Sequence, residues 1–294
     1  MSQSEPEFGD MGRYELKYCL PVALRDRVAE LARGHVEPDP YAEVLGPECW
    51  PANVGVPSGV LRGYVVHSLY YDTPRLDDYK DRLSEAKVRH RLRARTYGFP
   101  GEKRAIFLED KRKLDDRVIK SRVKLMHADL WCASQDPNPW RPLMHDIKPY
   151  ERLAARQFDK LVGDNTRVPV SVVHYTREVW VGLRTDQPKV RLTLDHAITG
   201  SIKPTPWDLY ATPDIHLIPP EYMVMEMKFD GQRPAWMRMI SAELGLRAEP
   251  VSKFGLSVAH GVRGATGGEL RYLTPRTLRR LGRSLAPIPA EAAQ

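Results

Sequence analysis

Several features are missing from this sequence, and each absence excludes a class of protein. The 294 residues contain no run of about 18 apolar residues, so no segment is long enough to span a membrane as a helix. The three cysteines, Cys19, Cys49 and Cys132, are odd in number and irregularly spaced, which excludes a disulfide framework or zinc pattern and fits a reducing compartment. The acidic, polar first ten residues are not a secretory signal. We therefore expect a cytoplasmic protein, with docking onto a membrane-protein partner left open.

Standard nucleotide-binding and catalytic motifs are also missing. The sequence has no G-x-x-x-x-G-K-[ST], and its glycine-rich stretch at 261–268 is followed by Glu269 and has no suitable lysine. It contains no HExxH, GxSxG or kinase catalytic-loop pattern. If the chain handles phosphates, side chains must do what loop amides do in P-loop proteins.

Length and charge favour a globular protein with an anionic partner. The chain has 45 Lys and Arg against 38 Asp and Glu, giving a formal charge of +7, and its pI is near 9.2. Such a balance favours an anionic ligand without saying which one. The composition along the chain predicts a flexible leader over 1–10, a single domain over 11–262, and a mobile tail over 263–294 that is basic and rich in Pro and Ala.

One predicted strand carries cations along a whole face. Side chains alternate between the two faces of a strand, so residues two apart point the same way. Guanidinium groups match the oxygens of phosphate, which makes multiply charged phosphate the natural ligand for such a face. The alternative is a solvated basic strand. The five cations on this face are Lys87, Arg89, Arg91, Arg93 and Arg95.

The same alternation recurs, which argues against a chance pattern. In five more segments charged residues, mostly cations, alternate with mostly apolar ones: 13–18, 107–113, 119–125, 191–195 and 225–229. Solvated outer faces would mix acids and bases more evenly. Strands of this kind can close into a barrel with a polar interior, provided that helices cover its apolar outside. We therefore predict an α+β fold, an eight-stranded antiparallel tunnel barrel with a cationic interior and helices packed outside.

The expected elements follow from periodicity and from turn residues. Strands are expected near 12–19, 61–71, 87–97, 104–112, 117–125, 168–181, 189–195 and 222–230. Helices are expected near 22–32, 76–83, 127–133, 150–162 and 234–245, and a long loop over 37–60.

Nine short motifs resemble those of VTC-type polyphosphate polymerase domains, which belong to the triphosphate tunnel metalloenzyme superfamily. Each motif alone is weak, but together they run in order from residue 13 to about residue 256. They are Arg13-Tyr-Glu-Leu-Lys17-Tyr, Tyr70-Tyr-Asp-Thr-Pro74, Arg91-Leu-Arg-Ala-Arg-Thr-Tyr-Gly98, Phe107-Leu-Glu-Asp-Lys-Arg-Lys113, Val118-Ile-Lys-Ser-Arg122, Tyr175-Thr-Arg-Glu-Val-Trp180, Arg191-Leu-Thr-Leu-Asp195, Met225-Glu-Met-Lys228 and Val251-Ser-Lys-Phe254.

The resemblance implies a tunnel that binds ATP and polyphosphate, and an enzyme that moves the terminal phosphoryl group of ATP to the growing chain with Mn²⁺ or Mg²⁺. Carried over by motif, the catalytic cations would be Lys17, Arg93, Arg95, Lys111, Lys120, Arg177, Arg191 and Lys253. Further substrate contacts would be Arg91, Arg122, Ser252, Lys228 and Tyr175.

The resemblance supplies only one matched metal ligand and two further candidates. Glu226 matches the family's metal-binding carboxylate, with Glu15 and Glu109 as further candidates. Hydrolytic members of the superfamily open with Glu-x-Glu-x-Lys, and Arg13 stands here at the first Glu position, which favours a polymerase over a triphosphatase. Without the resemblance, Glu15 could form a surface ion pair with Lys17. Glu109 could equally neutralise Lys111 or Arg93, and Asp195 is expected to orient an arginine rather than bind metal.

Three other functions stay open at this point. A triphosphatase would use the same tunnel, and a sensor would bind polyphosphate or nucleotide without turnover. A nucleic-acid binder fits the charge, but the sequence shows no aromatic platform like those of single-strand binders. Because an acceptor phosphate oxygen is already anionic, we expect no catalytic histidine and no serine nucleophile. Tyr70 and Tyr71 are expected to pack in the core.

Overall fold

The computed structural model describes residues 13–50, 57, 59–100, 104–114, 117–134, 136–163, 166–183, 189–213 and 215–266. The side chains of Arg13, Arg117 and residues 262–266 are not among those described. The predicted leader over 1–10 and the predicted tail beyond residue 266 lie outside these ranges.

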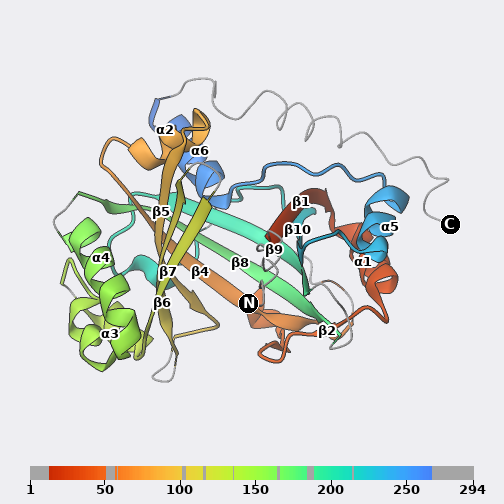
Figure 1. Cartoon of the computed structure of the whole chain (residues 1–294), viewed down its shortest axis with the longest axis horizontal. Coiled ribbons are helices and arrows are strands. Elements are labelled where there is room, and N and C mark those ends of the chain that lie inside the picture. The colour runs from red at the N-terminus through yellow and green to blue at the C-terminus, as the bar shows by residue number, and fades with distance from the viewer. Residues whose placement is uncertain are drawn as a thin grey trace, which may run out of the picture.

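A single antiparallel sheet organises the chain (Figure 1). Eight of its strands follow one another in the order β1-β10-β9-β8-β4-β5-β6-β7, while β2 pairs with β8 and β3 with β4. The strands are β1 Arg13–Pro21, β2 Val36–Pro38, β3 Glu43–Val44, β4 Arg62–Asp72, β5 Val88–Tyr97, β6 Ile106–Leu114, β7 Arg117–Leu125, β8 Val168–Gly182, β9 Val190–Ile202 and β10 Tyr222–Asp230.

The predicted antiparallel α+β fold is confirmed, with two differences. The sheet has ten strands rather than eight, because the expected loop over 37–60 contains β2 and β3. The sheet also does not close, since no pairing joins β1 to β7 within the described ranges. Lys17 on β1 and Lys120 on β7 line the same cavity.

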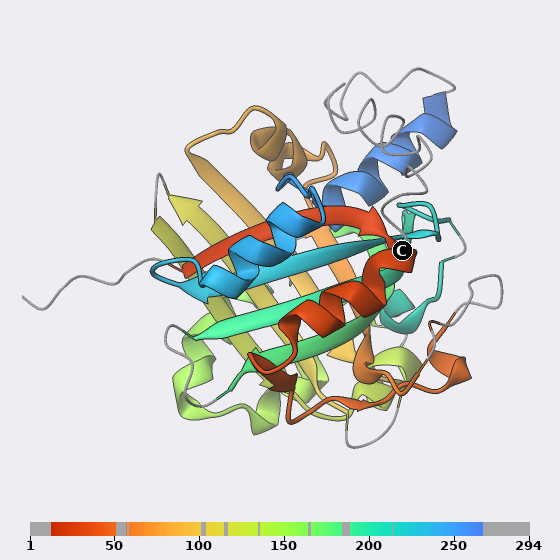
Figure 2. The same ribbon diagram turned by 90° about the vertical axis from the view of Figure 1, so that its right-hand side faces the viewer.

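Helices cover the convex side of the sheet, as its apolar outer residues require. In Figure 2, α1 and α5 lie across β1, β10 and β9. There Val28, Met237 and Ile240 pack with the alternate methionines of β10. On the other half, α3 and α4 cover β5 to β7 around Trp131, Trp140 and Phe158.

The helices and 3₁₀ turns are η1 Val22–Leu24, α1 Arg25–Ala32, η2 Pro47–Cys49, α2 Asp77–Leu83, α3 Ala128–Ala133, η3 Arg141–Asp146, η4 Pro149–Glu151, α4 Arg152–Gly163, η5 Asp208–Tyr210, α5 Ala235–Glu243 and α6 Lys253–Thr266. None of the helices in the described part of the chain is long and apolar enough to cross a bilayer.

Helix α6 was not expected from the sequence, and it lies on the concave side, where Tyr79 of α2 packs against its Phe254. It packs against β8 and β9, with Phe254, Leu256 and Val258 in an apolar cluster on that side. The glycines of α6 lower its helix propensity, so the sequence pattern did not predict a helix here. Gly261 is needed, because a Cβ there would overlap the side chain of Ile202. Ser252 caps the helix by accepting a hydrogen bond from the Gly255 N–H at 3.2 Å.

Candidate functional site

The concave side of the sheet holds a cavity of about 1210 Å³. Its lining includes eleven Lys and Arg side chains and four Asp and Glu side chains, an excess of seven positive charges. Every residue predicted for catalysis, substrate or metal lines this cavity: Glu15, Lys17, Arg91, Arg93, Arg95, Glu109, Lys111, Lys120, Arg122, Tyr175, Arg177, Arg191, Glu226, Lys228, Ser252 and Lys253. Lys87 and Arg89, the first two cations of the predicted row, do not line it.

The wall formed by β5, β6 and β7 carries a row of cations without carboxylate partners. Strand pairing places Arg91 opposite Lys111, and Lys111 opposite Lys120. No ion pair of these three side chains is found among the described residues. Burial, together with repulsion from Arg91, lowers the pKa of Lys111 to about 8. Like charges directly opposite one another destabilise a sheet, so this row of cations favours the binding of an anion.

One row further along the same wall, a carboxylate is enclosed by arginines. Glu109 lies opposite both Arg93 and Arg122. Its Oε2 accepts a hydrogen bond from Arg93 Nε at 2.5 Å, and its Oε1 lies 3.3 Å from Arg122 Nε. Burial tends to raise the pKa of Glu109, but Arg93 and Arg95 outweigh it and lower the pKa to about 2. Glu109 therefore neutralises arginines, one of the two roles left open for it.

The opposite wall has its own carboxylate, Glu226 on β10, surrounded by four cations. Lys228 Nζ lies 2.9 Å from its Oε2, and Lys253 Nζ and Lys17 Nζ lie 3.2 and 3.4 Å from its Oε1. Arg177 Nη2 is 3.5 Å from Oε2. Burial opposes the charged form, yet these cations hold the pKa of Glu226 well below its usual range.

Asp195 is a further buried carboxylate of this wall. Arg177 donates to it twice, from Nε to Oδ1 at 2.5 Å and from Nη2 to Oδ2 at 2.7 Å. This geometry agrees with the expectation that Asp195 orients an arginine. Lys253 Nζ also lies 2.5 Å from Oδ2, which the sequence did not suggest. Because α6 follows β9 at a distance along the chain, nothing local in the sequence indicates this contact.

The three predicted metal ligands do not gather at one point. Glu15 Oε1 lies 3.2 Å from Lys17 Nζ, the ammonium that also pairs with Glu226. Glu109 belongs to the arginines of the other wall. No group of three or more His, Cys, Asp or Glu able to hold a metal occurs in the described ranges. Glu15 and Glu226 offer the oxygen ligands that Mg²⁺ and Mn²⁺ prefer, so they fit a metal that takes its other ligands from phosphate and water.

Two tyrosines bring aromatic surface to the cations. Tyr175 lies under Arg177 and Lys253, whose charged groups are 5.2 and 4.8 Å from its ring centroid. Tyr70 packs against Phe254, as expected of a core residue, but it also lines the cavity. Its hydroxyl is 3.4 Å from Arg93 Nη1. Burial raises the pKa of Tyr70, but the arginines around it outweigh that effect and lower the pKa to about 7.

The end of the cavity near Tyr97 is aromatic, contrary to the expectation from the sequence. Tyr64 and Tyr97 meet edge to face at 5.0 Å between centroids, and Tyr97 and Phe107 at 5.8 Å. Arg191 donates to the Tyr64 hydroxyl at 2.7 Å and pairs with Asp39 at 3.0 Å. The expectation that no aromatic platform exists is therefore wrong. The three rings come from three strands, and only strand pairing brings them together.

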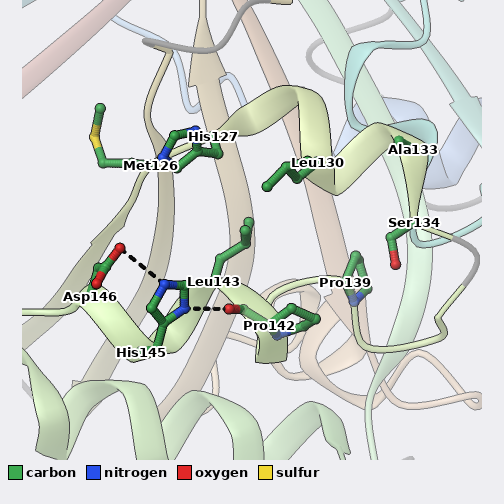
Figure 3. Close-up of a pocket in the computed structure, with 10 residues that line it drawn as sticks. All are labelled: Met126, His127, Leu130, Ala133, Ser134, Pro139, Pro142, Leu143, His145 and Asp146. Carbon is green, nitrogen blue, oxygen red and sulfur yellow. Dashed lines mark hydrogen bonds and ion pairs between the residues drawn. The ribbon is translucent and has the colours of Figure 1, made fainter.

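A second, smaller cavity lies between α3 and η3 (Figure 3). It measures about 380 Å³ and has no Lys or Arg in its lining. His145 stands at its edge with its ring nitrogens 2.6 Å from the Pro142 carbonyl oxygen and 3.0 Å from Asp146 Oδ2. This cavity has no means of binding a multiply charged phosphate.

Comparison with known proteins points to one family. The family model described as the VTC domain matches residues 12–261. No curated protein matches the chain. Among solved structures, the chain is similar to a Hippeastrum protein that is named as an adenylyl cyclase and described as having a dominant triphosphatase activity. The two sequences are 13% identical, the match covers 89% of this chain and 99% of that chain, and the TM-score is 0.44. A Vibrio parahaemolyticus protein named as an adenylate cyclase is 12% identical, with 84% and 98% covered and a TM-score of 0.37.

Proposed function

Because the chain belongs to the VTC domain family, we propose that it is an ATP-dependent polyphosphate polymerase, which transfers the γ-phosphoryl group of ATP to a growing polyphosphate chain and releases ADP. One observation carries the proposal: a cavity with an excess of seven positive charges, in which Arg91, Lys111 and Lys120 have no carboxylate partner among the described residues. A linear polyanion is the ligand that such a row fits.

The transfer needs alignment and charge stabilisation more than covalent chemistry. The bond from the γ-phosphorus to the β–γ bridging oxygen breaks, its electrons leave with ADP, and a terminal oxygen of the polyphosphate forms the new bond. Cations on both walls would hold the donor and acceptor phosphates in line and stabilise the charge that develops. These include Arg93 and Arg95 on β5 and Lys17 on β1.

Glu226 and Glu15 are the residues that would hold a divalent metal. When bound, Mn²⁺ or Mg²⁺ would supply charge neutralisation at the phosphate oxygens. The ammonium of Lys17 lies within ion-pair distance of both carboxylates. Lys17 therefore keeps the two carboxylates together and compensates their mutual repulsion.

The nearest alternative is a metal-dependent triphosphatase or polyphosphatase on the same fold, in which water replaces the acceptor phosphate. Water needs a base, whereas an acceptor phosphate oxygen does not. Burial raises the pKa values of Glu15, Glu109, Asp195 and Glu226, but neighbouring cations outweigh it and lower each of them. Such carboxylates are poor bases, which supports a polymerase.

Incubation with ATP and Mn²⁺, with and without a short polyphosphate primer, tests the proposal by staining for polymer. We expect polymer and ADP from the native chain and none from Arg93→Gln. The matched control is Arg89→Gln, on the same strand but outside the cavity lining, which should behave as the native chain. Free phosphate from tripolyphosphate without polymer would favour the triphosphatase. Binding without any turnover, across several metals, would favour a non-enzymatic sensor.

Thermal unfolding with ligands gives a second test. At 100 times its Kd a ligand adds about 2.7 kcal/mol to the free energy of unfolding. We expect a clear rise in Tm with tripolyphosphate and a much smaller one with monophosphate, because only the longer anion spans the cation rows. Equal shifts would count heavily against a cavity for linear phosphate. A nucleic-acid binder would instead show a steep loss of affinity with salt, and tripolyphosphate would compete poorly.

A further inference from the structure

Three aromatic side chains on neighbouring strands form a row along the inner face of the sheet. Tyr64 is on β4, Tyr97 on β5 and Phe107 on β6, with centroid distances of 5.0 and 5.8 Å along the row. Tyr64 and Tyr97 line the cavity. All three rings are partly exposed, whereas the rings that pack under α3 and α4, such as Trp140 and Phe158, are buried. Tyr64 and Tyr97 therefore offer apolar surface inside a polar cavity, and Phe107 continues that surface beside Tyr97.

A guanidinium extends the aromatic row. Arg122 Cζ lies 3.7 Å from the centroid of Phe107, a distance at which the planar group stacks on the ring. Glu109 fixes the other side of this arginine, with its Oε1 3.3 Å from Arg122 Nε. The Arg122 side chain nevertheless stays 49% exposed, so a planar ligand can still reach it. Phe107 and Arg122 together form a flat, cationic stacking surface.

The aromatic row lies at the end of a series of cations. Arg91, Arg93, Arg95 and Tyr97 occupy alternate positions of β5, so all four face the cavity. Two residues along a strand span about 6.6 Å. Ser68 Oγ accepts a hydrogen bond from Arg95 Nε at 3.0 Å, which holds the last of these cations beside the rings. A ligand lying along this series would meet charge first and then apolar, planar surface.

A linear polyphosphate would use the cations but not the rings. A molecule with several phosphates at one end and a planar ring at the other would use both. We propose that Tyr64, Tyr97, Phe107 and Arg122 form the binding surface for the base of a nucleoside triphosphate whose phosphates lie along Arg95, Arg93 and Arg91. The inference rests on the proposed function, because it takes ATP as the donor, and it adds a site for the nucleoside.

Stacking is the interaction that this surface supplies. It tolerates different bases, since every base has a π-face. We therefore expect ATP and GTP to bind with similar affinity, and both to bind more tightly than tripolyphosphate. A single-stranded oligonucleotide also presents bases and phosphates. Free nucleotide is favoured because two rings of the row, Tyr64 and Tyr97, line the cavity, whose lining carries cations from strands on both of its walls.

The test compares two ligands on one variant. Phe107→Leu keeps apolar volume but removes the stacking ring, and stacking on an aromatic side chain contributes about 1–3 kcal/mol per base. We expect Phe107→Leu to weaken ATP binding about tenfold in calorimetry and to leave tripolyphosphate binding within about twofold of the native value. The control is Phe99→Leu, an exposed phenylalanine that is not part of the aromatic row, which should change neither affinity.

The two readouts separate this inference from the proposed function. Equal loss of ATP and tripolyphosphate binding, or no loss of either, overturns the nucleoside site whether or not the chain makes polymer. Absence of polymer overturns the polymerase but leaves the binding comparison valid. An oligonucleotide that displaces ATP and binds more tightly would overturn the choice of free nucleotide as occupant.

A photolabel keeps the inference testable if Phe107→Leu folds poorly. The native chain is irradiated with 8-azido-ATP, whose reactive group sits on the base, and is then digested and mapped by mass spectrometry. We expect the label on peptides from β4, β5, β6 or β7 near the aromatic row, and its loss when excess ATP is present. A label confined to other parts of the chain, or one that tripolyphosphate prevents and ATP does not, would overturn the assignment.

Discussion

Arg177 holds Asp195 in a two-pronged ion pair, with Nε 2.5 Å from Oδ1 and Nη2 2.7 Å from Oδ2. The same carboxylate lies 2.5 Å from the ammonium of Lys253. One carboxylate thus ties β8 and β9 to the first residue of α6. Because Asp195 is fully buried, its charge is set against two cations that water cannot reach easily.

Replacing Asp195 by Asn should destabilise the ligand-free protein. The change leaves Arg177 and Lys253 buried with one anion fewer, and breaking a buried pair in this way costs about 3–5 kcal/mol. Tripolyphosphate supplies negative charge to the same cations, so it should recover part of the lost Tm. Thermal unfolding with and without tripolyphosphate measures both effects. Asp146→Asn, at an exposed pair with His145, is the control and should change little. An unchanged Tm for Asp195→Asn would contradict the role assigned to this carboxylate.

Replacing Glu226 by Gln should separate binding from turnover. The variant keeps the side chain's shape but frees four cations from their shared carboxylate, so metal-free tripolyphosphate binding should be no weaker than in the native chain. Polymer formation with Mn²⁺ should fall about 100-fold, or about 3 kcal/mol. Assays with saturating ligand keep the variant folded, and Glu243→Gln on the surface serves as the control. Full activity in Glu226→Gln would remove Glu226 from the proposed metal site.

Replacing Lys111 by Gln should change stability and affinity in opposite directions. Removing the central cation of the row relieves repulsion from Arg91 and Lys120, which should raise the ligand-free stability by up to about 1 kcal/mol. Losing a charge-assisted contact should weaken tripolyphosphate binding by about 1.5–3 kcal/mol. Lys124→Gln on β7, outside the cavity lining, is the matched control. If Lys111→Gln lost stability and kept its affinity, the row would not be an anion site.

The lowered pKa of Lys111 predicts a pH dependence whose sign can be worked out. Its pKa is about 8 in the folded chain against an ordinary value of 10.5, so between these limits the unfolded chain binds the extra proton. The contribution of Lys111 to the free energy of unfolding therefore rises with pH across this window. Phosphate favours the protonated form, so tripolyphosphate affinity should fall as the pH rises through about 8.

Calorimetry in buffers of different ionisation enthalpy should detect proton uptake on tripolyphosphate binding at that pH. Lys111→Arg stays charged and should reduce the uptake. Tyr70, with a pKa of about 7, adds negative charge over a lower range, and Tyr70→Phe removes that part. Identical uptake in the native chain and in Lys111→Arg would show that Lys111 does not titrate near pH 8.

The faces of individual strands could be predicted from the sequence, because the two-residue period of a strand is fixed by its geometry. Arg91, Arg93 and Arg95 share a face that lines the cavity for this reason. The same period could not tell where the cavity stops: Arg89 alternates with Arg91 on β5 but does not line the cavity, and neither does Lys87, which precedes the strand. The resemblance to VTC domains is confirmed by the family match over residues 12–261, while the roles of the site residues stay predictions.

Contacts between strands are what the sequence alone could not supply. The ion pair of Lys253 with Asp195 and the aromatic row both depend on which strands are neighbours and in what register. Helix α6 escaped detection because glycine lowers helix propensity, although Gly261 is what lets the helix approach the sheet. The lack of closure could not be read from alternation, which is the same in open and closed sheets.

The unpaired edges of β1 and β7 determine how a polymer can reach the cations. Moving these two strands apart breaks no hydrogen bond between them in the part of the chain that the structure describes, whereas parting any adjacent pair along the eight-strand path breaks a ladder. The wall therefore has a seam along its length. If the substrate is the polyphosphate proposed above, separating β1 from β7 at this seam would let a long chain enter sideways, without a free end having to be threaded.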